Sequence, residues 1–117
     1  MDIESYRTYC LKKKGVTEEF PFGVETLVFK VMGKMFALTS VEDFTSINLK
    51  VEPEVGIELR EKFPSVLPGY HMNKKHWITV LMDGSVPDKF IREWTDNSYQ
   101  LVASGLSKSQ QEALKAM

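Results

Sequence analysis

Three runs in the first half of the chain alternate apolar with polar or small side chains, which is the period of a half-buried β-strand. These runs are ETLVFKVM at 25–32, KMFALTS at 34–40 and TSINLKV at 45–51. The first two meet at Gly33-Lys34, where a glycine at the first central position suits a two-residue hairpin turn. The alternation predicts an antiparallel sheet with an apolar core face and an outer face that carries Lys30 and Lys50.

The same alternation assigns the other side chains to the two faces. The predicted core positions of the three runs are Leu27, Phe29, Val31, Phe36, Leu38, Thr45, Ile47, Leu49 and Val51. A later run, HWITVLM at 76–82, has the composition of a further strand. The alternation along this run places Ile78, Val80 and Met82 in the core. It places Trp77, Thr79 and Leu81 on the outer face.

Helix signals lie before, between and after these runs. The predicted helices cover 3–14, 53–63, a long segment from Pro87 to Val102, and a short segment that begins at the capping box 107–110. Asp2 is a suitable N-cap for the first helix, and Pro53 suits the first turn of the second. A loop, EEFPFG at 18–23, separates the first helix from the first strand.

A weaker strand, VLPGYH at 66–71, completes the order α-β-β-β-α-β-β-α-α, with MNKK as the hairpin loop before 76–82. Runs of strands with helices between them, rather than strict alternation, indicate the α+β class. We expect one domain over 1–117, built as a sheet of about five antiparallel strands with helices packed mainly on one face.

Charge adds one constraint on function. The chain has 117 residues and a net charge of −1. Proteins that neutralise many phosphates are usually basic, so this charge counts against strong non-specific DNA binding and still allows a local basic patch.

Cysteine content and hydropathy bear on the cellular compartment. The single cysteine, Cys10, cannot form an intramolecular disulfide, and its place on a helix stripe favours a buried, unreactive thiol. No run reaches the roughly 20 apolar residues of a membrane span. The N-terminal MDIESY lacks the apolar segment of a signal peptide. We expect a cytoplasmic protein without a membrane partner.

The stretch PGYHMNKKHW at 68–77 concentrates the residue types that could form a site. His71 and His76 could begin a metal site if they face each other across the hairpin. A zinc site needs three or four protein ligands, and the chain has no carboxylate between residues 62 and 82 and no paired cysteine. Histidines that hydrogen-bond at a strand end are therefore favoured, and we expect no metal and no other cofactor.

Trp77 raises a second possibility for this stretch. On the outer face, an exposed tryptophan beside Asn73, Lys74 and Lys75 could stack on a base while the lysines contact phosphates. The alternative is that a neighbouring helix or a dimer partner covers Trp77 and that the lysines only solvate the edge. The choice depends on strand parity, which a shift of one residue would reverse.

Motifs of the common enzyme classes are missing from the sequence. It contains no G-x-S-x-G elbow, no phosphate-binding G-x-x-x-x-G-K-[ST] loop and no G-x-G-x-x-G. We therefore expect a protein without catalytic activity. The remaining enzyme hypothesis is one in which His71 or His76 acts as an acid or base.

Several landmarks appear in order along nearly the whole chain. They are PFG at 21–23, VFKVMGKMFAL at 28–38, NLKVEPE at 48–54, GYHMNKKHWITV at 69–80, DGSVPD at 83–88 and SYQLV at 98–102. With these landmarks the chain resembles the MmcQ/YjbR family of small bacterial proteins, and GYHMNKKHW is the most specific of them.

The resemblance implies a CyaY/frataxin-like α+β fold and DNA binding by a double wing, in which hairpins contact the nucleic acid. The hairpin around GYHMNKKHW would be one wing. Family landmarks match Asn73, Lys74 and Trp77, and the family's strand lysines match Lys30 and Lys50.

Two hypotheses of function remain. In the first, the protein binds DNA, with phosphates contacted by Lys30, Lys50, Lys74 and Lys75. Asn73 would donate hydrogen bonds, Trp77 would stack, and His71 and His76 would add charge at lower pH. In the second, the same face binds a small anionic ligand or a protein partner and has no nucleic-acid role. The sequence leaves the DNA preference and the oligomeric state open.

Overall fold

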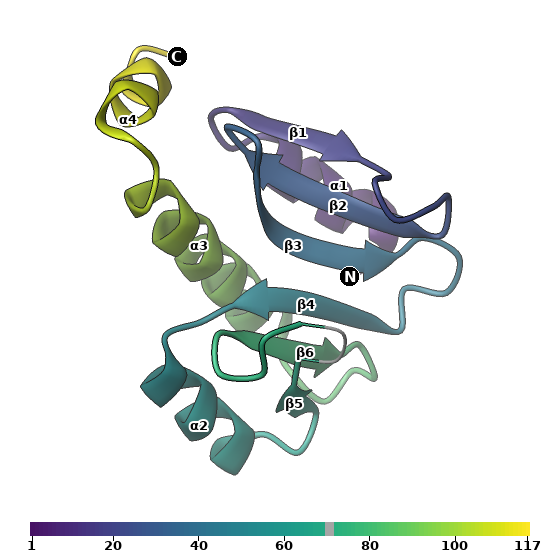
Figure 1. The fold of residues 1–117 in the computed structure, drawn as a ribbon. Helices are drawn as coiled ribbons and strands as arrows, with labels where there is room; N and C mark the ends of the chain where they lie inside the picture. Colours follow the sequence, from purple (N-terminus) through teal and green to yellow (C-terminus); the bar gives the residue numbers. More distant parts are fainter. Residues whose placement is uncertain (70–71) are drawn as a thin grey trace.

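A computed structural model describes residues 1–69 and 72–117 as an antiparallel sheet of six strands with four helices (Figure 1). The strand order is β1-β2-β3-β4-β6-β5. The elements are α1 (Ile3–Leu11), β1 (Val16–Glu19), β2 (Thr26–Val31), β3 (Lys34–Ser40), β4 (Ser46–Lys50), α2 (Pro53–Lys62), β5 (Val66–Pro68), β6 (Trp77–Leu81), α3 (Asp88–Ser104) and α4 (Lys108–Lys115). The predicted α+β class is confirmed, with one strand more than expected.

The additional strand is β1, which the sequence pattern does not indicate. Its residues, VTEE, carry one large apolar side chain, and β1 pairs only with β2 at the edge of the sheet. An edge strand with an exposed side has no need for apolar alternation. The first helix is shorter than predicted, because α1 ends at Leu11 and the chain then turns into β1.

The hydrophobic core lies between the sheet and the helices α1 and α3, which run behind the sheet in Figure 1. The ring of Tyr6 on α1 packs edge-on against Phe29, with centroids 6.0 Å apart. On α3, Tyr99 packs in the same way against Phe36 at 5.4 Å. Cys10 is buried in this core, as predicted. The helices leave the opposite, outer face of strands β2 to β6 uncovered.

A β-bulge in β3 changes which side chains reach the outer face. Phe29 pairs with Ala37 while Lys30 pairs with Met35, so Phe36 is one extra residue on β3. Phe36 and Ala37 both join the core. Leu38 consequently lies on the outer face against Val28, and its predicted core position is wrong.

Two local features near β2 to β4 also differ from the expectations. The β2–β3 turn is centred on Met32 and Gly33, which have φ values of 49° and 84°, rather than on Gly33-Lys34. Left-handed φ at both central residues is the type I′ geometry that matches strand twist. Thr45 lies before β4, is exposed, and hydrogen-bonds to Asp43 instead of packing in the core.

The hydroxyl of Ser98 joins α3 to the centre of the sheet. It donates to Phe36 O at 2.6 Å and accepts from Lys50 N at 2.9 Å. The pairing of β3 with β4 ends at Ala37 and Leu49. The Ser98 hydroxyl therefore lies between Phe36 and Lys50, which would form the next pair of a regular ladder. Ser98 therefore completes the ladder beside the bulge and fixes the end of β4.

The β5–β6 hairpin follows the predicted order with a shorter first strand. Pro68 pairs with Ile78, and Gly69 N donates to Trp77 O at 2.9 Å. A Cβ on Gly69 would lie 2.9 Å from that oxygen, which explains a glycine at this close backbone approach. The end of the predicted strand at His71, and any pairing of His71 with His76, lie outside the described residues.

The base of this hairpin is held by a cluster of Ser65, Asp83 and Ser85, called here the Asp83 latch. Ser65 donates to Asp83 Oδ2 at 2.8 Å and also hydrogen-bonds to the Ser85 hydroxyl. Ser85 N donates to Asp83 Oδ1 at 2.9 Å. These bonds, from Ser85 first and then from Ser65, lower the pKa of Asp83 to about 2. The latch ties the loop after β6 to the start of β5.

The lowered pKa of Asp83 predicts a pH-dependent stability. A carboxyl whose pKa is lower in the folded than in the unfolded chain stabilises the fold above its unfolded value of about 3.9. That contribution should disappear as the pH falls through about 2. By circular dichroism, Asp83→Asn should have a lower Tm than the parent protein at pH 6, and the difference should close towards pH 2.

A matched control for this prediction is Glu112→Gln on α4, because Glu112 is exposed and forms no salt bridge within the described part of the chain. Its Tm should follow that of the parent protein across the pH range. A constant Tm deficit of Asp83→Asn from pH 6 to pH 2 would show that the carboxylate is not what stabilises the latch.

Within the part of the chain that the structure describes, no helix combines the length and the apolar composition that crossing a membrane requires.

Candidate nucleic-acid interface

The loop before β6 presents its polar side chains to solvent. Asn73 Oδ1 accepts from Lys75 N at 2.9 Å, and Asn73 O accepts from His76 N at 3.1 Å. These two bonds form a tight turn in which the asparagine side chain substitutes for a backbone group. Asn73, Lys74, Lys75 and His76 are all exposed. Across 1–69 and 72–117, no salt bridge is found for Lys74, Lys75 or His76.

The end of β4 brings Lys50 to the same place. Lys50 is the register partner of Trp77, and Val51 N donates to His76 O at 2.8 Å. Lys50 is half-buried and has no carboxylate partner among the residues that the structure describes. Residues far apart in the sequence are thus neighbours along the backbone, and the name lysine patch is used here for Lys50, Asn73, Lys74, Lys75 and His76.

Lys30 does not belong to the lysine patch. It lies on β2, which β3 and β4 separate from β6. Its ammonium group is 3.2 Å from Glu19 Oε1 on the neighbouring edge strand. This ion pair offsets the charge of Lys30, so the two strand lysines of the sequence pattern have different surroundings.

Trp77 lies on the outer face, as the strand parity predicts, but its side chain is not available for stacking. Only 7% of the residue is exposed. It packs in a small outer-face cluster with Val28 and Leu38, against which Met35 and Met72 also pack. Of the two alternatives for Trp77, exposed or covered, the structure shows the covered one. Among the described residues, the cover comes from neighbouring strands and from Met72, rather than from a helix or a dimer partner.

His76 is exposed beside the lysines, whereas His71 lies outside the described residues. Within residues 1–69 and 72–117, no three side chains of His, Cys, Asp or Glu gather in a way that could hold a metal ion.

A cavity of about 370 Å³ opens on the outer face next to this cluster. It is lined by Phe22, Thr26, Met35, Leu38, Thr39, Ser40, Ser46, Asn48 and Met72. The sequence pattern does not indicate this outer-face cavity, because the lining residues come from three strands and two loops. One signal was present, since EEFPFG places apolar side chains in a loop, and Phe22 is indeed 64% exposed.

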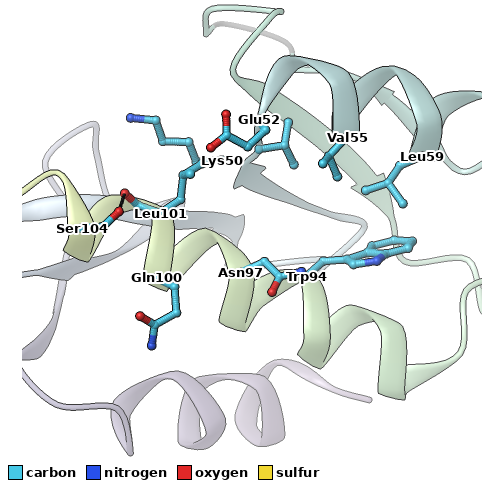
Figure 2. Close-up of a pocket in the computed structure, with 10 residues that line it drawn as sticks. Lys50, Glu52, Val55, Leu59, Trp94, Asn97, Gln100, Leu101 and Ser104 are labelled. Carbon is cyan, nitrogen blue, oxygen red and sulfur yellow. Dashed lines mark hydrogen bonds between the residues drawn. The ribbon is translucent and has the colours of Figure 1, made fainter.

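A second cavity, of about 410 Å³, lies between α2 and α3 (Figure 2). Figure 2 shows Lys50 and Glu52 near each other at one end, while Leu59 and Trp94 lie together at the other. The amide of Asn97 projects beside Trp94 from α3. This groove combines an apolar part with charged and amide groups, and it shares Lys50 with the lysine patch.

Comparisons with known proteins identify the family of the chain. The family model YjbR matches residues 11–101. The protein YbdF of Escherichia coli O157:H7, described as uncharacterised, is 40% identical over 97 residues, which are 82% of this chain and 80% of YbdF. The protein YjbR of Escherichia coli K12, also described as uncharacterised, is 34% identical over 115 residues, 97% of this chain and 98% of the relative.

A solved structure supports the same grouping. The crystal structure of Deinococcus radiodurans protein DR2400 superposes with a TM-score of 0.89 at 44% sequence identity, covering 97% of this chain and 87% of that one. Sequence and fold are therefore shared over almost the full length, so the chain belongs to the YjbR family.

Proposed function

We propose that the protein binds DNA through the lysine patch, in the manner of a wing whose tip is the loop before β6. The observation that carries this proposal is that Lys50, Lys74 and Lys75 have no acidic partners among the described residues and that the end of β4 is hydrogen-bonded to the loop that carries Lys74 and Lys75. Cations in such a position attract phosphates and release the counterions bound to them.

The overall charge of −1 is compatible with this proposal because a net charge does not determine where the charges lie on the surface. Some cations are held by carboxylates: Lys13 pairs with Asp96, and Lys30 with Glu19. Arg7 forms a bidentate pair with Glu18 on β1. The lysines of the lysine patch, by contrast, have no carboxylate partner within the described residues.

The members of the lysine patch have different roles in the proposal. The three lysines contact phosphate oxygens, and the amide nitrogen of Asn73 donates a hydrogen bond, since its oxygen already accepts from Lys75 N. Trp77 holds the loop in position from beneath, and Lys30 contributes only after it leaves Glu19. In a double-wing arrangement the β2–β3 hairpin would be the second wing.

Salt dependence and charge reversal test the proposal together. With three phosphate contacts, the logarithm of the affinity for duplex DNA should fall with the logarithm of salt at a slope of about −3. The double variant Lys50→Glu/Lys74→Glu should reduce that slope by about two and weaken binding at low salt by at least about tenfold. Fluorescence anisotropy of labelled duplex DNA, from roughly 50 to 200 mM salt, measures both quantities.

The matched control is Lys108→Glu/Lys115→Glu on α4. It changes the net charge by the same amount, and α4 stands apart from the β5–β6 hairpin in Figure 1. Its affinity should stay near that of the parent protein. Equal losses in the two double variants would show that net charge matters and that the lysine patch is not the site.

A small anionic ligand is the second candidate, and the groove between α2 and α3 favours it. An amphipathic anion could place its charge at Lys50 and its apolar part against Leu59 and Trp94. Salt separates the two functions, because apolar burial resists screening while phosphate contacts weaken steeply as salt rises.

A further inference from the structure

The outer-face cavity is next to the lysine patch and has no role in the contacts described so far. Met72 lines the cavity, and Asn73, Lys74 and Lys75 are the residues that follow it. A polymer held by these lysines would therefore pass close to the cavity opening. The cavity volume of about 370 Å³ is at the lower end of the range for small-ligand sites, which suits one ring system rather than a long chain.

The apolar side chains around the cavity suit a flat ring. Phe22 lines the cavity and is 64% exposed, so much of its side chain is open to a ligand. Met35, Leu38 and Met72 line other parts of the cavity, and methionine adapts its shape to aromatic partners. Phe22 can therefore stack on a flat ligand, whereas Trp77 cannot because it is buried.

The polar groups of the cavity require a hydrogen-bonding ligand. Asn48 Oδ1 already accepts from Thr79 Oγ1 at 2.6 Å. No partner for the Asn48 amide nitrogen is found in the described part of the chain, so this group is a donor available at the cavity. The hydroxyls of Thr26, Ser40 and Ser46 are close by. A purely apolar ring would leave the Asn48 donor unsatisfied, whereas a ring with carbonyl or ring-nitrogen acceptors would pair with it.

From these observations we propose that the outer-face cavity takes one unpaired base of a single-stranded nucleic acid, stacked on Phe22 and hydrogen-bonded to Asn48. This inference rests on the proposed DNA binding and specifies its substrate class. The lysines of the patch contact the adjacent phosphates. A duplex would have to unstack and unpair a base to reach the cavity, so single strands bind more tightly.

An oligonucleotide with internal abasic sites tests this inference, because it keeps every phosphate and lacks the bases. The parent protein should bind a single-stranded thymidine oligonucleotide about tenfold more tightly than its abasic counterpart at equal salt. Phe22→Ala should remove this preference while its salt dependence remains. Lys74→Glu should weaken both oligonucleotides to a similar extent. Fluorescence anisotropy with labelled oligonucleotides gives each affinity.

Two further variants, one in the same loop as Phe22 and one at Phe22 itself, make the test specific. Val24→Ala removes an apolar side chain that is 85% exposed and does not line the cavity, and it should leave the preference unchanged. Phe22→Tyr retains the ring and should restore the preference. Because Phe22 is exposed, its substitutions should leave Tm near the parent value.

The outcomes separate this inference from the proposed function. Salt-dependent binding with equal affinity for the thymidine and abasic oligonucleotides would overturn the base site and leave the lysine patch supported. The base site is also overturned if Val24→Ala and Phe22→Ala have the same effect. Absence of binding to every duplex and single strand at low salt would overturn both proposals.

Discussion

Replacement of Trp77 by alanine should lower the free energy of unfolding by about 3–5 kcal/mol. The residue is 7% exposed and forms the outer-face cluster with Val28 and Leu38, so the truncation leaves a cavity that its neighbours can only partly fill. A loss of this size is a large part of the 5–15 kcal/mol by which domains are commonly stable. Urea denaturation followed by circular dichroism measures it.

The Trp77 substitution also distinguishes a structural from a DNA-contacting tryptophan. Trp77→Phe keeps much of the buried apolar volume and should cost clearly less stability than alanine. Met72 packs on the same cluster, so Trp77→Ala should also loosen the loop that carries the lysines. A variant with parental stability and lost DNA binding would contradict the structural role and return Trp77 to the binding surface.

Ser98→Ala should destabilise the protein by about 2–4 kcal/mol, although it removes a single oxygen atom. The change leaves Phe36 O and Lys50 N without their partner, and each buried backbone group left unpaired costs roughly 1–3 kcal/mol. The β3 bulge prevents these two groups from simply pairing in the regular ladder. Chemical denaturation of the variant measures the loss.

Ser104→Ala on the same helix is the control for Ser98. Ser104 is exposed, and its hydroxyl only donates to Leu101 O one turn earlier. Its stability should change by less than about 0.5 kcal/mol. Because Ser98 fixes the backbone of Lys50, Ser98→Ala should also weaken DNA binding. Equal stability of the two serine variants would show that the bridge between α3 and the sheet contributes little.

The strands with clear apolar alternation could be predicted from the sequence, together with their order along the chain and their antiparallel arrangement, whereas the order of the strands in the sheet was not predicted. Leu38 shows the limit of this reasoning. Its neighbours alternate regularly in the sequence, and only the pairing with β2 and β4 shows that Phe36 is an extra residue. A bulge depends on contacts between strands, which a single strand's pattern does not contain.

The candidate site was predictable in its chemistry and only partly in its geometry. The exposed Lys74 and Lys75 followed from the turn residues around them, and Lys50 from the parity of its strand. The burial of Trp77 could not be predicted, because the side chains that cover it come from a loop methionine and from strands that are distant in the sequence. The ion pair between Lys30 and Glu19 could not be predicted either, since strand β1, which carries Glu19, was not predicted.

The buried Cys10 gives the native chain a chemical reporter of its own motions. Burial raises the pKa of this thiol to about 12, and the side chain is shielded by the core beneath α1. A thiol reagent can therefore modify it only during moments when α1 separates from the sheet or when the whole domain opens. Modification rates measured against denaturant would tell these two openings apart, in a protein whose single cysteine makes every adduct assignable.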